Sequence, residues 1–321
     1  MKSLTFFPRE PKFDFLRLRW ISLGMFALLF AVSLGAIATK GFNLALDFTG
    51  GTVTELRFAQ PVDVEAARKR LEAAGYAGAQ VLSIGSGNDL LVRMQLGDGS
   101  DGSDAGANAK AAAEITRAVS TPENPGTVMR SDFVGPQIGK ELALNGIWAV
   151  IFVVVGFLIY ISFRFEKKFA IAAVIASLHD VLAVLGWFAL TGHEFDLTVL
   201  AGVLSVLGFS INDTIVVFDR IRENFRSMRA DADTIINVSI NQTLSRTVIT
   251  SFVAFLTVLA LYLYGGGSLR GMAESQMIGV IIGSLSTIFL AAPLLTLGIL
   301  KVTKQDLLPK AKDEEILARR P

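Results

Sequence analysis

Long apolar runs recur along the chain. A helix needs about 20 apolar residues to cross a bilayer, and six runs come close to that length. They are Trp20–Ala38, Ala143–Phe163, Phe169–Leu190, Leu197–Phe218, Val248–Tyr264 and Met277–Leu300. A long segment of ordinary soluble composition separates the first run from the second, while the other connections are short. The pattern therefore predicts an α-helical membrane protein with one helix, a soluble domain and then five more helices.

The segment between the first two runs has the pattern of an α/β domain. Its expected strands are Val53–Phe58, Gln80–Ile84, Leu90–Leu96 and Thr127–Phe133. One helix is expected from its N-cap Asp63 to Ala74, where Gly75 ends it, and another over Ala107–Val119. The order strand–helix–strand–strand–helix–strand is typical of a ferredoxin-like fold. We therefore expect a small ferredoxin-like domain between the first and second membrane helices.

Composition narrows the class of protein further. Of the 321 residues, 52% are hydrophobic and 18% are charged, whereas soluble proteins carry about a quarter charged residues. A wholly soluble globule is therefore excluded. The chain has no Cys and two His, so it has no disulfide or thiol nucleophile and little room for a His-rich metal site.

Basic residues lie mainly on one side of the predicted spans. They occur before the first span, between the second and third, between the fourth and fifth, and after the sixth. They are Lys2, Arg9, Lys12, Arg17, Arg19, Arg164, Lys167, Lys168, Arg220, Arg222, Arg226, Arg229, Lys301, Lys304, Lys310, Lys312, Arg319 and Arg320. The connections Thr191–Asp196 and Gly265–Gln276 on the other side contribute only Arg270. Because basic loops stay in the cytoplasm, we expect cytoplasmic termini and an extracytoplasmic insert.

This orientation predicts the domain organisation. Residues 1–39 form the cytoplasmic N-terminus and the first span, and residues 40–141 form the periplasmic domain. Residues 142–300 hold the other five spans, and residues 301–321 form a cytoplasmic tail. A cleaved signal peptide ending near Ala36-Ile37-Ala38 is the alternative for the first span, but its apolar run is longer than a usual signal core.

The sequence contains no convincing motif for nucleotide binding, metal binding or hydrolysis. The run Gly97–Gly102 matches G-x-G-x-x-G by letter, but its aspartates would repel phosphate, and no helix follows directly. A flexible linker is the better interpretation. No hydrolase, zinc or P-loop motif stands in a plausible site. We therefore expect no enzyme, catalytic residue, cofactor or metal, and an energy source in an ion gradient or a partner.

Ionisable residues inside the predicted spans are the best functional candidates, because each costs roughly 2.5–3.5 kcal/mol at the centre of a membrane helix on insertion scales. Asp213 lies about 10 Å inward from Arg220 at the helical rise, on a small polar face with Gly202 and Ser210. We expect it to bind and release a cation beside Arg246. A carboxylate that only pins neighbouring helices is the alternative.

Polar side chains near Arg246 fall on one helical face. They are Gln242, Thr243, Arg246, Thr250 and Thr257. Such a stripe can line a hydrated path, although Thr hydroxyls often bond to their own helix. Asp180 in the third span is expected either in a relay or in a static helix contact. Gly279, Gly283 and Ser286 in the sixth span favour close helix packing, and His193 and Glu194 are expected to be solvated.

Several segments together resemble one known family. They are Leu46–Thr52 (LDFTGGT), Phe133–Gly139 (FVGPQIG), Leu178–Val181 (LHDV), Ser210–Asn224 (SINDTIVVFDRIREN) and Gln242–Thr247 (QTLSRT). In this order, they resemble the SecD/SecF family of protein-export membrane proteins, within the resistance-nodulation-division superfamily. The resemblance implies half of a transporter of that superfamily, in the bacterial inner membrane.

The resemblance also implies partners and residue roles. It implies pairing with SecD into a twelve-helix unit, association with SecYEG, with YajC and YidC, and action on unfolded preproteins with the proton-motive force. The ion-translocation residues would be Asp213, Arg246, Thr250, Asn212 and Asp180. The hinge residues would be Gly50, Gly51, Gly135 and Pro136.

Alternatives remain open at this level. A small-molecule or lipid exporter of the same superfamily would use the same intramembrane charges. A non-conducting scaffold for SecD is a third interpretation, and the coupling ion can be H⁺ or Na⁺. No interaction with nucleic acid is expected.

Overall fold

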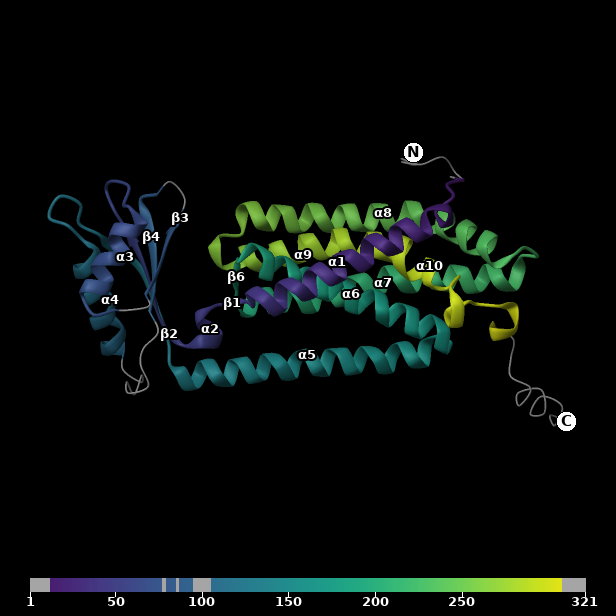
Figure 1. The fold of residues 1–321 in the computed structure, drawn as a ribbon, viewed down its shortest axis with the longest axis horizontal. Coiled ribbons are helices and arrows are strands. Elements are labelled where there is room, and N and C mark those ends of the chain that lie inside the picture. The colour runs from purple at the N-terminus through teal and green to yellow at the C-terminus, as the bar shows by residue number, and fades with distance from the viewer. Residues whose placement is uncertain (1–11, 77–78, 85–86, 95–104, 308–321) are drawn as a thin grey trace, which may run out of the picture. The chain divides into compact units, whose positions relative to one another are not determined.

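The computed structural model describes residues 12–76, 79–84, 87–94 and 105–307, and most of its helices and strands are labelled in Figure 1. Contacts divide the chain into two units, Leu44–Ala149 and the remainder. We call the first the soluble unit and the second the membrane unit. The run Gly97–Gly102 and the last two residues of the predicted strand Leu90–Leu96 lie outside the described residues.

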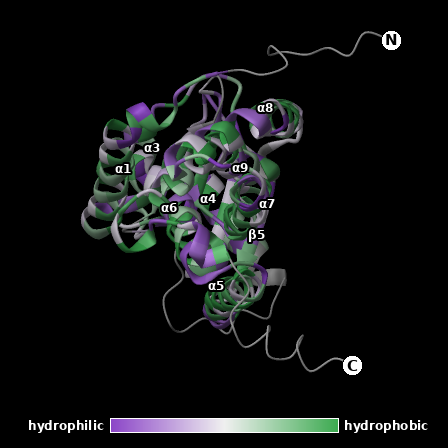
Figure 2. Ribbon diagram, turned by 90° about the vertical axis from the view of Figure 1, so that its right-hand side faces the viewer, coloured by the Kyte–Doolittle hydropathy of each residue, from purple (hydrophilic) through white to green (hydrophobic). Residues whose placement is uncertain are grey.

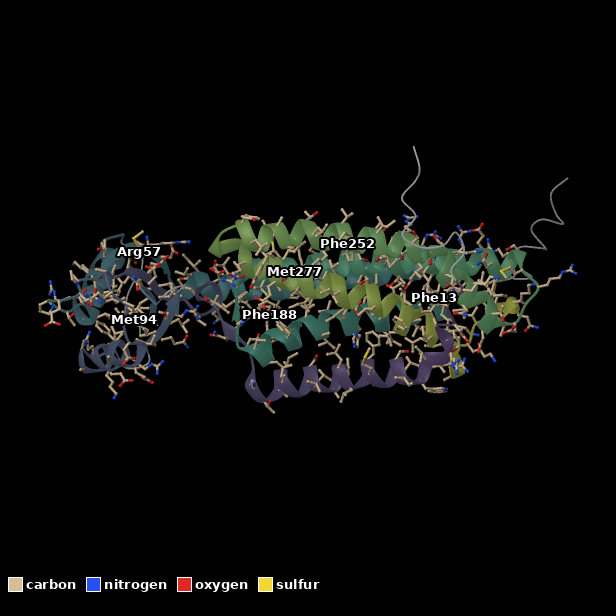
Figure 3. The ribbon with its side chains drawn as sticks, turned by 90° about the horizontal axis from the view of Figure 1, so that it is seen from above. Phe13, Arg57, Met94, Phe188, Phe252 and Met277 are labelled. Atoms are coloured by element: carbon tan, nitrogen blue, oxygen red, sulfur yellow. The ribbon has the colours of Figure 1, made fainter. Side chains whose placement is uncertain are left out.

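The six predicted spans are confirmed. Among the described residues, six helical segments are long and apolar enough to cross a membrane. They contain α1 (Arg19–Lys40), α5 (Pro136–Arg164), α6 (Lys167–Thr191), α7 (Leu197–Ser227), α8 (Ala232–Tyr264) and α9 (Gly267–Ser286). Figure 2 shows these helices coloured largely as hydrophobic. In Figure 3, Phe252 labels an exposed site on α8 and Phe188 a buried one on α6.

The predicted start of the fifth span was wrong. Helix α8 begins at Ala232 rather than at Val248, because Asp231 caps it. The Asp231 carboxylate accepts a hydrogen bond of 3.0 Å from the backbone N–H of Thr234. The first turns of α8 carry polar residues such as Asn237 and Asn241, which lower hydropathy but not helix formation. Arg246 therefore lies well inside the helix.

The predicted bounds of the sixth span, Met277–Leu300, were also wrong. Helix α9 begins at Gly267, so most of the expected loop Gly265–Gln276 is helical. The chain then widens into a π-helical turn over Thr287–Ala291 and ends as α10 (Ala292–Leu294). Pro293 has no N–H to continue the helical ladder, and Gly298 follows with φ +42°.

Helices α7 and α9 pack closely, as expected for the small residues of the sixth span. A Cβ added at Gly279 would lie 2.1 Å from Val206 Cγ2, and one at Gly202 would lie 2.0 Å from Ser275 Oγ. Elsewhere in this unit, Phe165, Phe169 and Phe218 form a buried aromatic cluster with ring centroids 5.3–6.3 Å apart. The membrane unit thus supplies its own partner for the glycine face.

The soluble unit has the predicted order of elements. After α2 (Leu46–Thr49), the elements are β2 (Gly51–Arg57), α3 (Val64–Ala73), β3 (Gln80–Ile84), β4 (Asp89–Met94), α4 (Ala105–Val119) and β5 (Thr127–Val134). Asp63 caps α3 as expected and accepts a 2.9 Å hydrogen bond from the N–H of Glu65. The described strands form an antiparallel sheet in the order β3-β4-β2-β5.

The core of this unit is built from the strands and both helices. Leu56, Leu71, Leu90 and Ile115 are fully buried together. The short strands β1 (Asn43–Leu44) and β6 (Glu194–Phe195) are not part of this sheet. In the membrane unit, the rings of Phe42 and Phe195 lie 5.1 Å apart.

Candidate functional site

Asp213 lies in α7, and its carboxylate contacts α8. Its side chain is buried, and its Oδ2 accepts a hydrogen bond of 3.3 Å from the hydroxyl of Ser251. This distance is long for an O–H···O hydrogen bond, so the carboxylate is only weakly restrained. Sequence reasoning did not find Ser251, because its role depends on the register of α8 against α7.

Arg246 and Thr250 of α8 lie within electrostatic reach of Asp213, but among the described residues no ion pair joins Arg246 to this carboxylate. Both are exposed in the membrane unit, and Asn212 of α7 is exposed beside Asp213 in sequence. The structure therefore gathers the predicted acid, the predicted cation and Thr250 along the contact of two helices. An Arg exposed on a membrane helix is costly in lipid, so this face requires a polar or protein covering.

The predicted stripe on α8 is largely exposed. Gln242, Arg246, Thr250 and Thr257 are exposed, whereas Thr243 is buried and does not continue the stripe. The Thr250 hydroxyl donates to the backbone carbonyl of Arg246 at 3.0 Å, and the Thr257 hydroxyl donates to a carbonyl one turn earlier. Their donors are thus used within α8, but their oxygen lone pairs remain available as acceptors.

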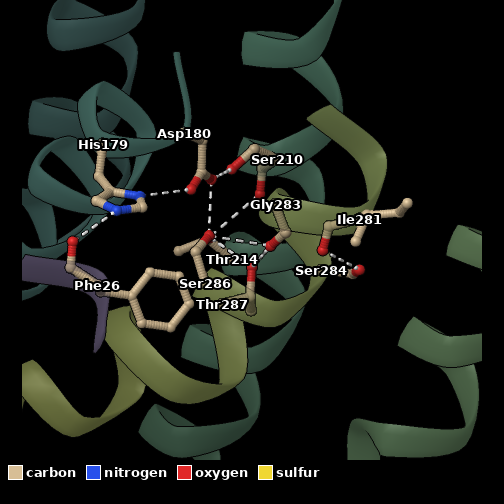
Figure 4. A network of polar contacts seen from close by, with 10 residues as sticks. All are labelled: Phe26, His179, Asp180, Ser210, Thr214, Ile281, Gly283, Ser284, Ser286 and Thr287. Atoms are coloured by element: carbon tan, nitrogen blue, oxygen red, sulfur yellow. Dashed lines mark hydrogen bonds and ion pairs between the residues drawn. The ribbon is translucent and has the colours of Figure 1, made fainter. Parts of the chain in front are cut away.

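Asp180 is the centre of a separate buried network, shown in Figure 4. Its Oδ2 accepts hydrogen bonds from Ser210 of α7 at 2.5 Å and from Ser286 of α9 at 2.7 Å. His179 Nδ1 lies 3.3 Å from Oδ1, and His179 Nε2 lies 3.1 Å from the backbone oxygen of Phe26 in α1. The Asp180 carboxylate and the His179 ring together thereby connect four helices of the membrane unit.

A second layer of hydroxyls extends this network. The hydroxyl oxygens of Thr214 and Thr287 lie 3.1 Å apart. Thr214 donates to the carbonyl of Ser210, and Thr287 donates to the carbonyl of Gly283. Ser210 precedes Asp213 by three residues, so the network reaches within one turn of Asp213 along α7. The sequence placed Ser286 only on a packing face and did not indicate its bond to Asp180.

The predicted hinge glycines lie in the soluble unit and have unusual backbone angles. Gly50 has φ +67° and Gly51 has φ +124°, which favour glycine at both positions. Gly135 does not have a positive φ, and Pro136 begins α5. Gly51 pairs with Val134 across β2 and β5. The two motifs are therefore neighbours in the sheet.

Gly139 brings the same two motifs still closer together. A Cβ at Gly139 would lie 2.9 Å from the backbone nitrogen of Gly50. On the other side, the guanidinium of Arg93 in β4 donates a 3.0 Å hydrogen bond to the carbonyl of Leu44. Burial lowers the pKa of Arg93, while the charge of Asp47 opposes that change. The chain thus leaves and re-enters the sheet at one tightly packed junction.

His193 was expected to be solvated, and its side chain is indeed exposed, but it also has partners that were not expected. Its Nδ1 lies 2.7 Å from Glu274 Oε1, and the indole N–H of Trp187 donates to the same oxygen at 2.8 Å. These residues come from α6, the connection after it and α9. No sequence signal links such distant positions.

Family models match most of the chain. The model described as "Protein export membrane protein SecD/SecF, C-terminal" matches residues 115–300, and "SecD/SecF GG Motif" matches residues 35–62. The second match includes Gly50 and Gly51. The first includes the Asp213 site and the Asp180 network.

Curated relatives agree with the family models. "Protein translocase subunit SecF" of Pseudomonas aeruginosa is 41% identical over 302 residues, which cover 94% of this chain and 95% of the relative. The protein of the same name from Escherichia coli O157:H7 is 39% identical and covers 88% and 86%. "Protein translocase subunit SecDF" of Brucella abortus is 36% identical, and the match covers 95% of this chain but 40% of that relative.

Solved structures share the fold. The crystal structure of SecDF from Thermus thermophilus, described as a translocon-associated membrane protein, matches with a TM-score of 0.80 and 37% identity. That match covers 91% of this chain and 39% of the solved one. SecDF in a super-membrane-facing form matches with a TM-score of 0.64 and 34% identity, over 96% and 40% of the two chains. This chain thus spans about two fifths of the SecDF chains.

Proposed function

Because the chain belongs to the SecD/SecF family of protein-export membrane proteins, we propose that it uses the proton-motive force to promote preprotein translocation by the Sec machinery. As a family member it is a multi-pass inner-membrane protein with an accessory role in protein export. The finer proposal concerns how a gradient is used. Asp213 carries that proposal.

The proposed cycle starts from the charge of Asp213. An ionised Asp213 near Arg246 is tolerable in a low dielectric, whereas either charge alone is costly. A proton that binds Asp213 neutralises it and releases Arg246 to another partner. The long 3.3 Å bond from Ser251 supports this exchange, because it restrains the carboxylate only weakly. Loss and gain of this pairing bias two helix arrangements.

The energy available is sufficient for such a switch. One elementary charge moved through 100 mV provides about 2.3 kcal/mol. That free energy changes a conformational equilibrium roughly fifty-fold at room temperature. No bound cofactor, metal or catalytic residue is needed, because the H⁺ or Na⁺ gradient itself is the energy source. The protein is therefore proposed to be a transport subunit and not an enzyme.

The exposed polar face supports a protein partner in the membrane. Arg246, Thr250 and Asn212 lie exposed on α8 and α7, where lipid would be an unfavourable neighbour. We assign this face to SecD, which would complete a twelve-helix unit and the second wall of the ion path. Fused SecDF relatives are more than twice as long as the match. SecYEG, with YajC and YidC, and an unfolded preprotein complete the proposed assembly.

The soluble unit is proposed to be periplasmic and ferredoxin-like. The distribution of basic residues supports this side of the membrane, with both termini in the cytoplasm. The strand order β3-β4-β2-β5, with two helix-containing crossovers, supports the ferredoxin-like assignment. Gly50, Gly51, Gly135 and Pro136 would act as the hinge through which the membrane unit moves this domain.

Translocation of a trapped preprotein in vesicles, with and without an imposed gradient, tests the proposal. Asp213→Asn is expected to abolish the stimulation by the gradient while the protein stays in the membrane. Asp219→Asn is the matched control, because Asp219 lies on the same helix but pairs with Arg164 and is partly exposed. Near-normal gradient stimulation in Asp213→Asn would reject the assignment. Unchanged stimulation in every variant would instead favour a scaffold.

A further inference from the structure

The negative charge of an ionised Asp180 has no Lys or Arg to compensate it among the described residues of the membrane unit. The side chain of Asp180 is fully buried. Of the side chains that the structure describes, only that of His179 is in ion-pair range, with 3.3 Å between Nδ1 and Oδ1. A buried carboxylate without a compensating charge is far too costly to persist ionised. Burial therefore favours a positive charge or a bound proton at this position, against the opposing effect of the hydroxyl donors.

The geometry of His179 shows where that proton lies. Nε2 is 3.1 Å from the backbone oxygen of Phe26, and a carbonyl oxygen only accepts hydrogen bonds, so Nε2 must carry a hydrogen. In neutral imidazole, Nδ1 is then a bare acceptor that faces Asp180 Oδ1. Two acceptors repel each other at this distance. The contact becomes attractive only with one more proton between the two residues.

The other oxygen of Asp180 is already fully engaged. Ser210 and Ser286 donate to Oδ2 at 2.5 and 2.7 Å, so the extra proton belongs on the Oδ1 side. The Phe26 ring lies edge-on to His179 at 5.0 Å and the Phe30 ring lies stacked at 6.4 Å. Aromatic rings of this kind tolerate a neutral or a cationic imidazole.

The described partners of the pair are aromatic rings, hydroxyls and a backbone carbonyl. Helix α1 presents Phe26 and Phe30 to the pair, α7 presents Ser210, and α9 presents Ser286. Within the described part of the chain, no further acid or base forms a hydrogen bond or ion pair with either side chain. The charge balance therefore closes within the pair itself.

We propose that His179 and Asp180 form a second proton-binding site, distinct from Asp213, which holds one shared proton. The proton resides either on Asp180 as a carboxylic acid or on His179 as an imidazolium, and both arrangements are neutral overall. Its loss would leave the carboxylate facing a bare nitrogen and weaken the junction of α1, α6, α7 and α9. Only the role of the site in transport rests on the proposed function; the site itself rests on the contacts above.

The proton itself can be observed directly. The chain has two histidines, so His193→Gln leaves His179 as its single ¹⁵N-histidine signal. The full chain, labelled in this way and placed in lipid bilayers, is studied by NMR from about pH 5 to pH 8, where unperturbed histidine titrates. Infrared difference spectra between the wild type and Asp180→Asn report whether Asp180 is protonated.

Two results support the site and one overturns it. A neutral imidazole with a protonated Asp180, or an imidazolium with an ionised Asp180, is the expected result near neutral pH. A neutral imidazole beside an ionised Asp180 would overturn the proposal. This readout does not depend on transport, so it remains decisive even if a variant is inactive.

The role in transport is tested with Asp180→Asn in the preprotein assay. The amide keeps the shape and can still hydrogen-bond, but it cannot take up the extra proton. Gradient stimulation is expected to fall at least about fivefold, the low end of typical coupling between sites. Normal stimulation in Asp180→Asn together with loss in Asp213→Asn would reduce the pair to a helix contact. Normal stimulation in both variants would reject the proposed function, while the spectra still decide the shared proton.

Discussion

Asp180 and Asp213 are both buried carboxylates of the membrane unit, but their surroundings are opposite. Asp180 receives two short hydroxyl bonds at one oxygen and faces His179 with the other. Asp213 receives one long bond from Ser251 and lies next to a helix face that exposes Arg246 and Thr250. The comparison shows that burial alone does not define an ion-exchange site.

The number and closeness of the donors make the difference. A carboxylate with all its partners in place loses much when any of them moves, so it keeps its helices together. A weakly bonded carboxylate can change its charge state with little rearrangement. We therefore assign the main ion exchange to Asp213, and to Asp180 a more tightly held proton whose loss would weaken the helix junction.

The contact that encloses Asp180 provides the largest expected effect. Gly279→Leu places a side chain where even a Cβ would lie 2.1 Å from Val206, which forces α7 and α9 apart. Overpacking of this kind costs about 1–3 kcal/mol or more, so we expect a lower free energy of unfolding in detergent and less protein in the membrane.

A matched control separates packing from the loss of a glycine. At Gly156 on α5, a Cβ would meet no heavy atom within 4 Å. Gly156→Leu should therefore unfold like the wild type. Equal stability of Gly279→Leu and Gly156→Leu would contradict the close packing of α7 and α9.

Arg246→Met tests the difference between the two carboxylates by changing the surroundings of Asp213 alone. The variant removes the cation that acts on Asp213 but leaves the Asp180 network intact. Because an uncompensated buried charge costs several kcal/mol, gradient-driven translocation should fall roughly tenfold or more. Arg246→Lys keeps the charge and should retain part of the activity. Equal activity of Arg246→Met and the wild type would show that Arg246 is not part of the exchange.

A Ser→Ala substitution at one hydroxyl donor of each carboxylate is expected to have a smaller effect on the free energy of unfolding, and the two variants can be compared directly. Ser286→Ala removes a 2.7 Å bond to Asp180, and Ser251→Ala removes a 3.3 Å bond to Asp213. We expect losses in the free energy of unfolding of about 1–3 kcal/mol for the first and less than about 1 kcal/mol for the second. Denaturation in detergent measures both, and the reverse order would break the comparison.

An acid outside the membrane gives the smallest effect. Hydrogen bonds from Arg57 lower the pKa of Asp89 in the soluble unit. This pair therefore stabilises the folded state above the unfolded pKa of about 3.9, and the contribution is lost as the pH falls through the lower folded value. Between about pH 5 and pH 3, Asp89→Asn should lose less stability than the wild type. Hydrogen exchange of β2 and β4 amides measures this, and identical pH profiles would contradict it.

The sequence was sufficient for the elements that depend on local patterns. The N-cap at Asp63 and the order of strands and helices in the soluble unit follow from alternation and capping residues. The beginning of α8 was missed because hydropathy ignores polar helical turns, although Asp231 and Thr234 form a recognisable cap. The N-cap that marks the beginning of a helix was present in the sequence, but the hydropathy of the first turns of α8 was too low to indicate a membrane span.

The partners in the site were not predictable in the same way. Asp213 and Asp180 stand out in the sequence as charges within apolar runs. Their donors Ser251 and Ser286, however, are ordinary serines until the helices are packed and the register is fixed. The pairing of His193 with Glu274 likewise depends on long-range packing.

Cation flux across vesicles that contain the chain with its SecD partner tests the central claim most directly. An imposed pH or Na⁺ gradient should dissipate through the wild-type complex and through the Asp219→Asn control, and not through Asp213→Asn. If Asp213→Asn passes the cation as fast as the wild type, ion exchange at Asp213 is contradicted.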